Sequence, residues 1–425
     1  MGFRQNHFAG LLASTRENSV MGKKKIFNDP VYGFVSIPYG IIFNLIEHPY
    51  FQRLRRIKQV SMTHYVYPGA LHTRFHHALG ALHLMTQALN TLREKGTAIT
   101  DEEVTAASIA ILLHDIGHGP FSHTLENTLI DVSHEQLSEL FMEKLNEEFA
   151  GQLEVAISIF QDKHPKKFLH QLVSGQLDMD RMDYLNRDSF FTGVYEGVIG
   201  YDRIIKMLAV HQGELVVEEK GMYSIEKFLI ARRLMYWQVY LHKTVLSAER
   251  MLIQALRRAR ELALSGVQLP CPPSLAFFLN QSVTSHDFLN DRDRLLHHFA
   301  ALDDYDVISA VKSWMDHPDR LLSFISAGII NRRLFRLELS DTPFPAGRIE
   351  QLRQSLLEWW GEPGLDLSYL LLTGQEKNRT YNVSKEEINI LYKSGEVRPM
   401  SSIYHQTIDT RETTKYYLCY PKYLL

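Results

Sequence analysis

The sequence predicts a mainly α-helical protein, in which a helical bundle with short β-hairpins over residues 25–265 precedes a smaller α+β region over residues 266–425. Two observations predict this fold class. Apolar residues recur at helical spacing through most of the first part, whereas aromatic, β-rich segments are frequent towards the C-terminus. The segment Gly266–Pro273 separates the two parts, because three prolines in its last four residues prevent a helix from continuing. We expect residues 1–24, which show no clear amphipathic pattern, to form a poorly anchored N-terminal extension.

Start and stop signals divide the helical part into elements. Residues 31–38 alternate and are rich in β-formers, which predicts a short hairpin or edge strand. Pro49 stands where a new helix can begin, Gly96 ends a helix, and Ser133 and Gln136 form a capping box at the start of another. Helices are expected over residues 41–59, 77–95, 104–113, 133–149, 166–189, 225–243 and 245–264, with further helices over 280–335. The third of these is apolar nearly all round and is therefore predicted to be buried.

The composition excludes several classes of protein. Of the 425 residues, 45% are hydrophobic and 22% charged, as in a globular protein with a large core. A formal net charge of −3 argues against a protein that coats nucleic acid. The two cysteines, Cys271 and Cys419, rule out a disulfide framework and fit a reducing cytoplasm. The longest apolar run, Ala106–Leu113, is too short to cross a membrane, and Met1–Val20 lacks the apolar core of a signal peptide. We therefore predict a cytoplasmic location without membrane contact.

Histidines are concentrated in one stretch of the chain. Nine of the 20 histidines lie between residues 60 and 140, where uniform scatter would place about four. They are His64, His72, His76, His77, His83, His114, His118, His123 and His134. Histidine is the commonest metal ligand and a general acid or base near neutral pH, so this excess indicates a metal or catalytic site.

The strongest candidate for such a site is Ile111–His123, where a buried apolar helix ends in an adjacent His114 and Asp115. An ionised aspartate and several imidazoles at the end of a buried helix cost on the order of several kcal/mol unless a cation or partner compensates them. A divalent metal does so directly, since it takes imidazole nitrogen and carboxylate oxygen together. The alternative is that His114 and Asp115 bond only to each other. The glycine-rich exit and two further histidines, His118 and His123, favour the metal.

Two further segments can reach this site. His77 lies at the start of the preceding helix, and antiparallel packing would bring it beside His114. Within residues 177–188, helical spacing places four side chains on one face: Asp180, Tyr184, Arg187 and Asp188. A charged face is usually exposed to solvent, but the interleaved leucines and methionines indicate that this helix is packed.

The residues His77, His114, Asp115 and Asp180 form the H…HD…D signature, and at this point the chain resembles the HD-domain metal-dependent phosphohydrolases. Within that superfamily it is most similar to the deoxynucleoside triphosphate triphosphohydrolase branch, which in animals is fused to a sterile-alpha-motif domain. The segments that carry this resemblance are residues 28–33, 51–59, 67–77 and 114–123. The resemblance covers roughly residues 25–245 and implies an HD-domain helical bundle, while nothing recognised after residue 265 carries chemistry.

The resemblance implies a role for particular residues. The metal ligands would be His77, His114, Asp115 and Asp180. The phosphates would be bound by Arg74, Arg181 and Arg232. The reacting phosphate would face His118, His123 and His134. The sugar would contact Gln59 and Asp188, and sugar and base would pack against Tyr184 and Tyr240. The chain departs from the family pattern at Arg181, where lysine is usual, at His76, where an acidic residue is usual, and at Leu241, which replaces a glutamine and leaves the base contacts open.

These residues predict a metal-dependent phosphohydrolase with one divalent ion per chain. A site of histidine and aspartate ligands accepts Mg, Mn, Fe, Co, Ni or Zn, so the sequence does not determine which metal is bound. The leading hypothesis is hydrolysis of a deoxynucleoside triphosphate to the deoxynucleoside and triphosphate by metal-activated water. One alternative is an HD phosphohydrolase acting on another phosphoester, a nucleoside monophosphate or an alarmone. The other is a nucleotide-sensing or nucleic-acid-binding regulator with little turnover, supported only by Lys23–Lys25 and Arg53–Arg56.

A second nucleotide site is implied by the same resemblance. The positions that bind an activating guanine nucleotide in the resembling branch are matched by Lys25, Asn28, Glu47, Gln52 and Arg55, with glutamate in place of aspartate at Glu47. Such sites lie between subunits, so the resemblance implies a homo-oligomer, either a dimer or a tetramer. The alternative, that Gln52 and Arg55 are ordinary helix-surface residues, has about equal support.

Overall fold

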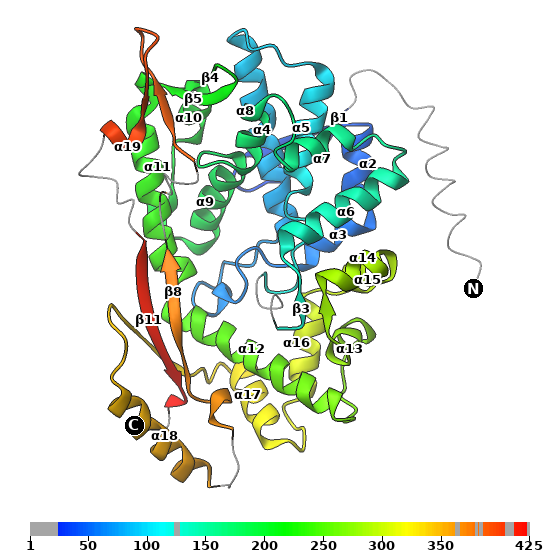
Figure 1. The fold of residues 1–425 in the computed structure, drawn as a ribbon, viewed down its shortest axis with the longest axis vertical. Coiled ribbons are helices and arrows are strands. Elements are labelled where there is room, and N and C mark those ends of the chain that lie inside the picture. Colours follow the sequence, from blue (N-terminus) through cyan, green and yellow to red (C-terminus); the bar gives the residue numbers. More distant parts are fainter. Residues whose placement is uncertain are drawn as a thin grey trace.

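The computed structural model describes residues 24–122, 128–361, 366–378, 381, 386–403 and 412–422. Most of the predicted N-terminal extension and the predicted site residue His123 lie outside these residues. The chain is mainly helical with small sheets, and its C-terminal part mixes helices and strands, which confirms the predicted fold class (Figure 1). Among the described residues, no helix is both long enough and apolar enough to cross a membrane.

The described chain begins with the predicted hairpin. Strands β1 (Lys24–Asp29) and β2 (Gly33–Pro38) are antiparallel, and one face of β2 buries Val35 and Ile37. The chain then forms α2 (Ile41–Glu47), α3 (Pro49–Gln52) and the short helices η2 (Arg53–Arg56) and η3 (Thr63–Tyr65). Pro49 is the first residue of α3, which confirms the predicted helix start.

Three helices position the candidate site: α4 (Arg74–Glu94), α5 (Asp101–Leu113) and α9 (Met179–Thr192). Helix α4 packs against both α5 and α9. Helix α5 is buried along most of its length, as its apolar sequence predicts, and the capping box of Thr100 and Glu103 fixes its start. Helix α4 begins at Arg74 rather than His77, because Thr73 and His76 form a capping box ahead of it.

The helices next to this centre are α6 (His134–Glu148), α7 (Glu154–Phe160) and α8 (Lys167–Ser174), and α6 starts at the predicted Ser133 cap. The single helix predicted over residues 166–189 is wrong, since α8 ends at Ser174 and α9 begins only at Met179. The Asp178 side chain caps α9 by accepting a hydrogen bond from the Arg181 amide at 2.7 Å. This break places Asp180 in the first turn of α9.

The middle of the chain continues through η4 (Tyr195–Gly197), α10 (Tyr201–Met207), the hairpin of β4 (Leu208–His211) and β5 (Glu214–Glu218), η5 (Glu219–Gly221), α11 (Met222–Met235) and α12 (Lys243–Leu264). Between α11 and α12 lies a π-helical turn, η6 (Tyr236–Tyr240). The two helices predicted over 225–243 and 245–264 are therefore present, but the first ends in this π-helical turn. The turn carries Tyr240, one of the predicted substrate residues.

The C-terminal part adds helices α13 (Pro273–Leu279), α14 (Ser285–Asn290), α15 (Arg292–Ala300), α16 (Asp304–Ser313), α17 (Arg320–Ile330), α18 (Ala346–Trp360), η7 (Leu367–Tyr369) and α19 (Met400–Ile403). Strands β7 (Arg336–Ser340), β11 (Thr413–Tyr420) and β8 (Leu372–Asn378) form an antiparallel sheet in that order. Strands β9 (Asn389–Leu391) and β10 (Val397–Pro399) instead extend the β4–β5 hairpin, with β9 parallel to β5. The short strands β3 (Ile130–Asp131) and β6 (Val283–Thr284) also pair in parallel.

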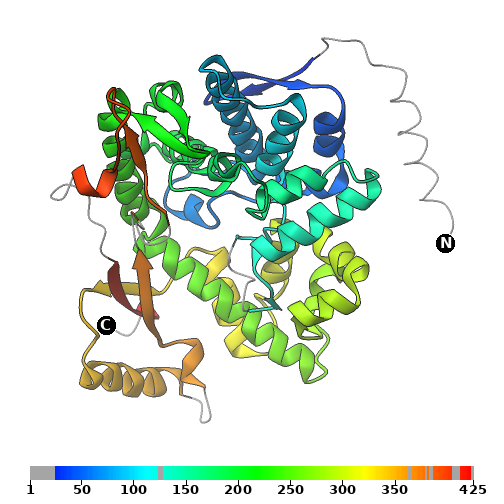
Figure 2. The same ribbon diagram turned by 45° about the horizontal axis from the view of Figure 1, so that its top comes forward.

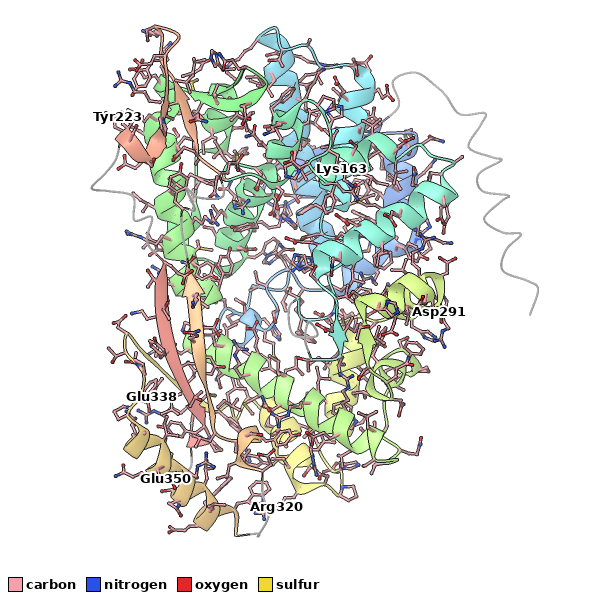
Figure 3. All side chains as sticks on the ribbon, viewed as in Figure 1. Lys163, Tyr223, Asp291, Arg320, Glu338 and Glu350 are labelled. Carbon is pink, nitrogen blue, oxygen red and sulfur yellow. The ribbon has the colours of Figure 1, made fainter. Side chains whose placement is uncertain are left out.

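The hydrophobic core is continuous across the predicted boundary at residue 265. One cluster of buried side chains extends from Val35 to Cys419, and α12 packs against α13, α17 and β7 (Figure 2). Charged residues such as Asp291 and Glu350 lie at the periphery of the molecule (Figure 3). The two parts thus share one hydrophobic core, and the division into two domains at residue 265 stays a prediction.

Candidate active site

Three side chains from three helices meet at the centre of the bundle. His77 lies in the first turn of α4, His114 caps the C-terminal end of α5, and Asp180 lies in the first turn of α9. Their ligand atoms all lie within 4.8 Å of one another. The His77 Nε2 atom is 3.1 Å from Asp180 Oδ1 and 3.3 Å from His114 Nε2, and His114 Nε2 is 3.5 Å from Asp180 Oδ1. The predicted antiparallel packing of His77 beside His114 is therefore present.

The donor set of these residues fits a divalent cation. In both histidines the Nδ1 atom, which faces away from the cluster, has a hydrogen-bond acceptor. His77 Nδ1 lies 2.7 Å from Asp183 Oδ2, and His114 Nδ1 lies 2.6 Å from the Ile111 carbonyl. When a cation takes the place of the second ring proton, a proton on Nδ1 leaves the Nε2 lone pair of each histidine directed at the shared centre. Burial opposes a charge on His77, but the hydrogen bonds to Asp180 and Asp183 outweigh it and raise the pKa of His77 to about 10. The cluster thus has an anionic environment that a cation can occupy.

Asp115, the fourth predicted ligand, borders this centre. Its carboxylate oxygens lie 3.7 Å from His77 Nε2 and 3.5 Å from His114 Nε2. The same carboxylate forms an ion pair with Arg74 and lies 3.2 Å from His118 Nδ1. Burial opposes ionisation, yet Arg74 and His118 hold the pKa of Asp115 well below its usual range. Asp115 is therefore ionised between the metal cluster and the predicted phosphate residues, and its role as a ligand stays a prediction.

The predicted reacting residues lie on the Asp115 side of the cluster. The rings of His118 and His134 are 4.0 Å apart between centroids. Burial and the charge of Arg74 lower the pKa of His118 to about 3, so its ring is neutral near pH 7. Arg74 also donates from Nη2 to Ser122 Oγ at 2.7 Å, next to the segment that contains His123. The structure thus brings His118, His134 and Arg74 together, and His123 lies outside the described residues.

The predicted sugar residues form a second group. Asp188 accepts a hydrogen bond at Oδ2 from the Tyr240 hydroxyl at 2.6 Å, and its Oδ1 lies 2.7 Å from His72 Nε2. Tyr184 and Tyr240 meet edge to face at 6.1 Å between ring centroids. Gln59 Oε1 is buried and has no hydrogen-bond partner within the described part of the chain, as expected of a group that meets a ligand.

The two remaining predicted phosphate residues converge on one turn. Arg181 pairs with Asp178 and donates to the Gly175 carbonyl, while Arg232 donates to Gln176 Oε1 at 3.4 Å. Burial raises the pKa of Asp178 to about 7 even though Arg181 opposes the shift. Arg181 of α9 and Arg232 of α11 thus both contact the turn that precedes Asp180.

Sequence reasoning missed several residues that support the site. Asp183 and Arg187 are fully buried, whereas the pattern of residues 177–188 had assigned Arg187 to the face of Asp180 and Tyr184. Arg53, part of the basic run that could have indicated nucleic acid, is also fully buried and donates to the carbonyls of Ile116 and His118 at 2.7 and 2.9 Å. No local pattern separates such residues from exposed ones.

Comparison with known proteins defines the class. Residues 74–188 match the HD domain, and residues 199–267 match the HD associated region. A phosphohydrolase from Bacteroides thetaiotaomicron, known from a crystal structure, shares 50% identity and a TM-score of 0.90, and the match covers 94% of this chain and 100% of that one. The chain belongs to the HD-domain phosphohydrolases, as the H…HD…D signature predicts.

Two further relatives show how far the likeness extends. The uncharacterized protein YwfO of Bacillus subtilis is 30% identical over 427 residues, which cover 96% of this chain and 94% of that protein. The deoxynucleoside triphosphate triphosphohydrolase SAMHD1 homolog of Dictyostelium discoideum is 31% identical over 278 residues, covering 61% of this chain and 53% of that protein. The predicted resemblance to the deoxynucleoside triphosphate triphosphohydrolase branch is confirmed, over about half of that relative.

Proposed function

We propose that this protein hydrolyses deoxynucleoside triphosphates to the deoxynucleoside and inorganic triphosphate, with one divalent metal ion per chain. The observation that carries the proposal is the convergence of three groups. His77, His114 and Asp180 can hold the metal. Arg74, next to this cluster, offers a positive charge to phosphates, and the hydrogen-bonded pair of Asp188 and Tyr240 offers contacts to a sugar. A tripolyphosphate ester carries about four negative charges, so a site for it needs both a cation and arginines.

The chain's own residues bind and orient the substrate. Arg74, Arg181 and Arg232 neutralise the phosphates, and the fork of the guanidinium suits bidentate contacts to them. Neutral His118 and its neighbour His134 offer hydrogen bonds to the reacting phosphate. Gln59 and Asp188 hold the sugar, and Tyr184 and Tyr240 pack around it. The metal would polarise a phosphoryl oxygen and supply activated water.

The test is product identification with metal-reconstituted protein and each of the four dNTPs and four NTPs. We expect inorganic triphosphate and the deoxynucleoside, resolved by ion-exchange chromatography. His114→Ala and Asp180→Ala should remove the metal from a folded protein and abolish this release. Turnover that yields only phosphate or pyrophosphate, or full metal occupancy in both variants, would contradict the proposal.

The same assay separates the alternatives. Activity confined to a nucleoside monophosphate or an alarmone would support the other HD phosphohydrolase hypothesis. A regulator with little turnover would bind nucleotide without releasing product. The basic run over residues 53–56 gives that reading little support, because Arg53 is fully buried and Arg56 pairs with Asp303.

We further propose that the protein forms a homo-oligomer, a dimer or tetramer, that a guanine nucleotide activates. Gln52 Oε1 accepts a hydrogen bond from Arg55 Nε at 2.8 Å, and the Arg55 guanidinium lies 3.5 Å from the centre of the Phe75 ring. Phe75 also contacts Phe27 of β1, the strand that carries Lys25 and Asn28. Mass measurement and kinetics with and without GTP test this proposal. A monomer with nucleotide-independent kinetics would contradict it.

We also propose a cytoplasmic location, supported by two cysteines that form no disulfide. Fractionation of cells that produce the protein tests it, and recovery outside the cytoplasm would contradict it.

A further inference from the structure

A series of buried ionic contacts leads away from the metal cluster. It starts at His77, whose Nδ1 lies 2.7 Å from Asp183 Oδ2. Arg187 donates from Nε to that same oxygen at 2.8 Å and from Nη2 to Asp183 Oδ1 at 3.0 Å. Its Nη1 donates to Asp29 Oδ2 at 2.8 Å. The side chains of His77, Asp183 and Arg187 have no exposed surface, so every charge in the series depends on its neighbours.

The series ends in the turn between β1 and β2. The other oxygen of Asp29 accepts the backbone amides of Val31 and Tyr32 at 2.8 and 3.0 Å. Both oxygens of Asp29 are therefore held, and through Arg187 the turn fixes the position of Asp183. A metal-cluster histidine on α4 is thus tied to α9 and to the N-terminal hairpin.

Gly80, one helical turn after His77 in α4, provides the space for these contacts. A Cβ atom at residue 80 would lie 2.0 Å from Asp183 Oδ1 and 2.2 Å from Arg187 Nη2. Any larger residue would push the carboxylate and guanidinium away from His77. Glycine in a helix interior destabilises the helix relative to alanine, so its presence here fits a requirement for space.

We propose that Asp183, held by Arg187 and Asp29, is a positioning residue that fixes His77 with Nδ1 protonated and Nε2 free to bind a divalent cation. It thereby sets the affinity of the site for the metal. A carboxylate can only accept a hydrogen bond, so it selects the tautomer that carries its proton on Nδ1. The proposal rests on the metal site of the proposed function, but it concerns cation binding and not the identity of the substrate.

The experiment measures the dissociation constant for Mn²⁺ of the full-length protein after metal removal. Asp183→Asn should weaken binding by roughly 10- to 100-fold, the usual effect of losing such a partner, because an amide can donate to Nδ1 and favour the wrong tautomer. Gly80→Ala, which retains every charge, should weaken Mn²⁺ binding by displacing the same pair. It therefore carries the test if Asp183→Asn fails to fold.

Matched controls lie at the N-cap of α17 and within that helix, away from the cluster. Asp319→Asn removes one carboxylate from an ion pair with Arg258, and Gly328→Ala places a Cβ atom 2.7 Å from Met251 Cε. Both variants should leave the dissociation constant for Mn²⁺ unchanged. The position of the proton on the His77 ring can also be measured, and it should not change if Asp183 has only a structural role. In Zn²⁺-loaded protein labelled with ¹⁵N-histidine, the Nδ1–H signal of His77 should be present in the wild type and lost in Asp183→Asn, because a ring held with its proton on Nε2 does not bind Zn²⁺ through that nitrogen.

Two results would overturn the proposal: wild-type Mn²⁺ affinity in both folded site variants, or an equal loss of affinity in the α17 controls. Failure of the proposed function looks different. If the wild type binds Mn²⁺ in a way that depends on Asp183 but releases no triphosphate, only the substrate assignment is wrong. If the wild type binds no Mn²⁺, the metal site itself is wrong and both proposals fall.

Discussion

At the scale of single residues, His118 shows how environment sets a possible role. Burial and Arg74 lower its pKa to about 3, so the ring carries no charge across the physiological range. A neutral imidazole next to ionised Asp115 can donate or accept a hydrogen bond at the reacting phosphate, but it does not add a positive charge there. This distinguishes His118 from the arginines, whose charge neutralises the substrate.

We expect His118→Ala to retain metal and nucleotide binding but to lower the single-turnover rate by ~10²-fold or more, the usual scale for a removed catalytic group. The sequence predicts the same for His123→Ala. Metal content, melting temperature and rate are measured on one preparation. His170→Ala is the control, because His170 lies in α8 with Nδ1 2.9 Å from the Ile159 carbonyl. A near-wild-type rate in His118→Ala would show that this histidine only supports the turn.

The residues that could be predicted from the sequence are those whose chemistry is unusual for their position. His114 and Asp115 follow a buried apolar helix, and Asp180 stands among leucines and methionines. Charged groups at such positions indicate a metal or catalytic site. The sequence indicates that the helix of Asp183 and Arg187 is packed, but not that both residues lie against His77, because the space for that contact is provided by Gly80, which lies on another helix. A partner that is distant in sequence leaves no local pattern.

At the scale of elements, the turn after α5 joins the metal cluster to α6. The Gly117 amide donates to Ser138 Oγ at 3.0 Å, and that hydroxyl donates to the His114 carbonyl at 2.8 Å. A Cβ atom at residue 117 would lie 2.3 Å from both the His134 carbonyl oxygen and the Ser138 nitrogen. Backbone atoms cannot rotate away as a flexible side chain can, so the close approach of the turn to α6 requires glycine.

We therefore expect Gly117→Ala to lower stability by about 1–3 kcal/mol, the range for overpacking, and to lower activity by separating His118 from His134. Thermal melting and the turnover rate per folded molecule measure the two effects. Gly347→Ala in α18, where a Cβ atom meets nothing within 4 Å, is the matched control and should not destabilise the protein. Equal melting temperatures for both variants would contradict the expectation.

Helix α17 offers a pH-dependent prediction away from the site. Asp319 caps α17 by accepting the Leu322 amide at 2.8 Å and pairs with Arg258 of α12 at 2.6 Å. Burial opposes ionisation, but the hydrogen bond from Arg258 outweighs it and lowers the pKa of Asp319. A lowered carboxyl pKa stabilises the fold above the unfolded-state pKa of about 3.9, and this contribution is lost as the pH falls through the folded-state value.

We accordingly expect Asp319→Ala to destabilise the protein by about 1–2 kcal/mol at pH 7, the scale of a lost helix cap. The difference from the wild type should shrink as the pH falls below about 4. Urea unfolding at a series of pH values measures this. A difference that stays constant down to pH 3 would show that the charge of Asp319 contributes nothing.

At the scale of the whole molecule, the order of the helices could be predicted from the sequence. The contacts between the helical part (residues 25–265) and the C-terminal part (residues 266–425) could not. Strand β9 pairs with β5 although about 170 residues separate them in the chain. No periodicity within 386–403 indicates where that short strand pairs, because pairing depends on an open sheet edge elsewhere. For the same reason the sequence assigned no chemistry to the C-terminal part, whereas the structure places it next to the turn that precedes Asp180.

That contact is made by Glu386. Its Oε2 accepts the Gln176 amide at 2.7 Å, and its Oε1 accepts Gln171 Nε2 at 2.9 Å. Gln176 Oε1 in turn accepts from Arg232, and the preceding residue, Gly175, accepts from Arg181 through its carbonyl. The C-terminal part thus holds the turn on which two proposed phosphate-binding arginines converge, and none of its described residues contacts the metal cluster.

We expect Glu386→Ala to release this turn and raise KM for the nucleotide several-fold, because the variant loses both hydrogen bonds to the carboxylate, each worth about 1.5–3 kcal/mol, and only part of that loss reaches the two arginines. The Mn²⁺ dissociation constant should be unchanged, because Asp180 remains held by His77 and His114. Glu396→Ala, which removes an exposed carboxylate that pairs only with Arg398 among the described residues, is the matched control in the same region. Steady-state kinetics separate KM from kcat. Loss of kcat at constant KM would place the effect of Glu386 on the reacting groups, and wild-type values for both would show that the C-terminal part acts on stability alone.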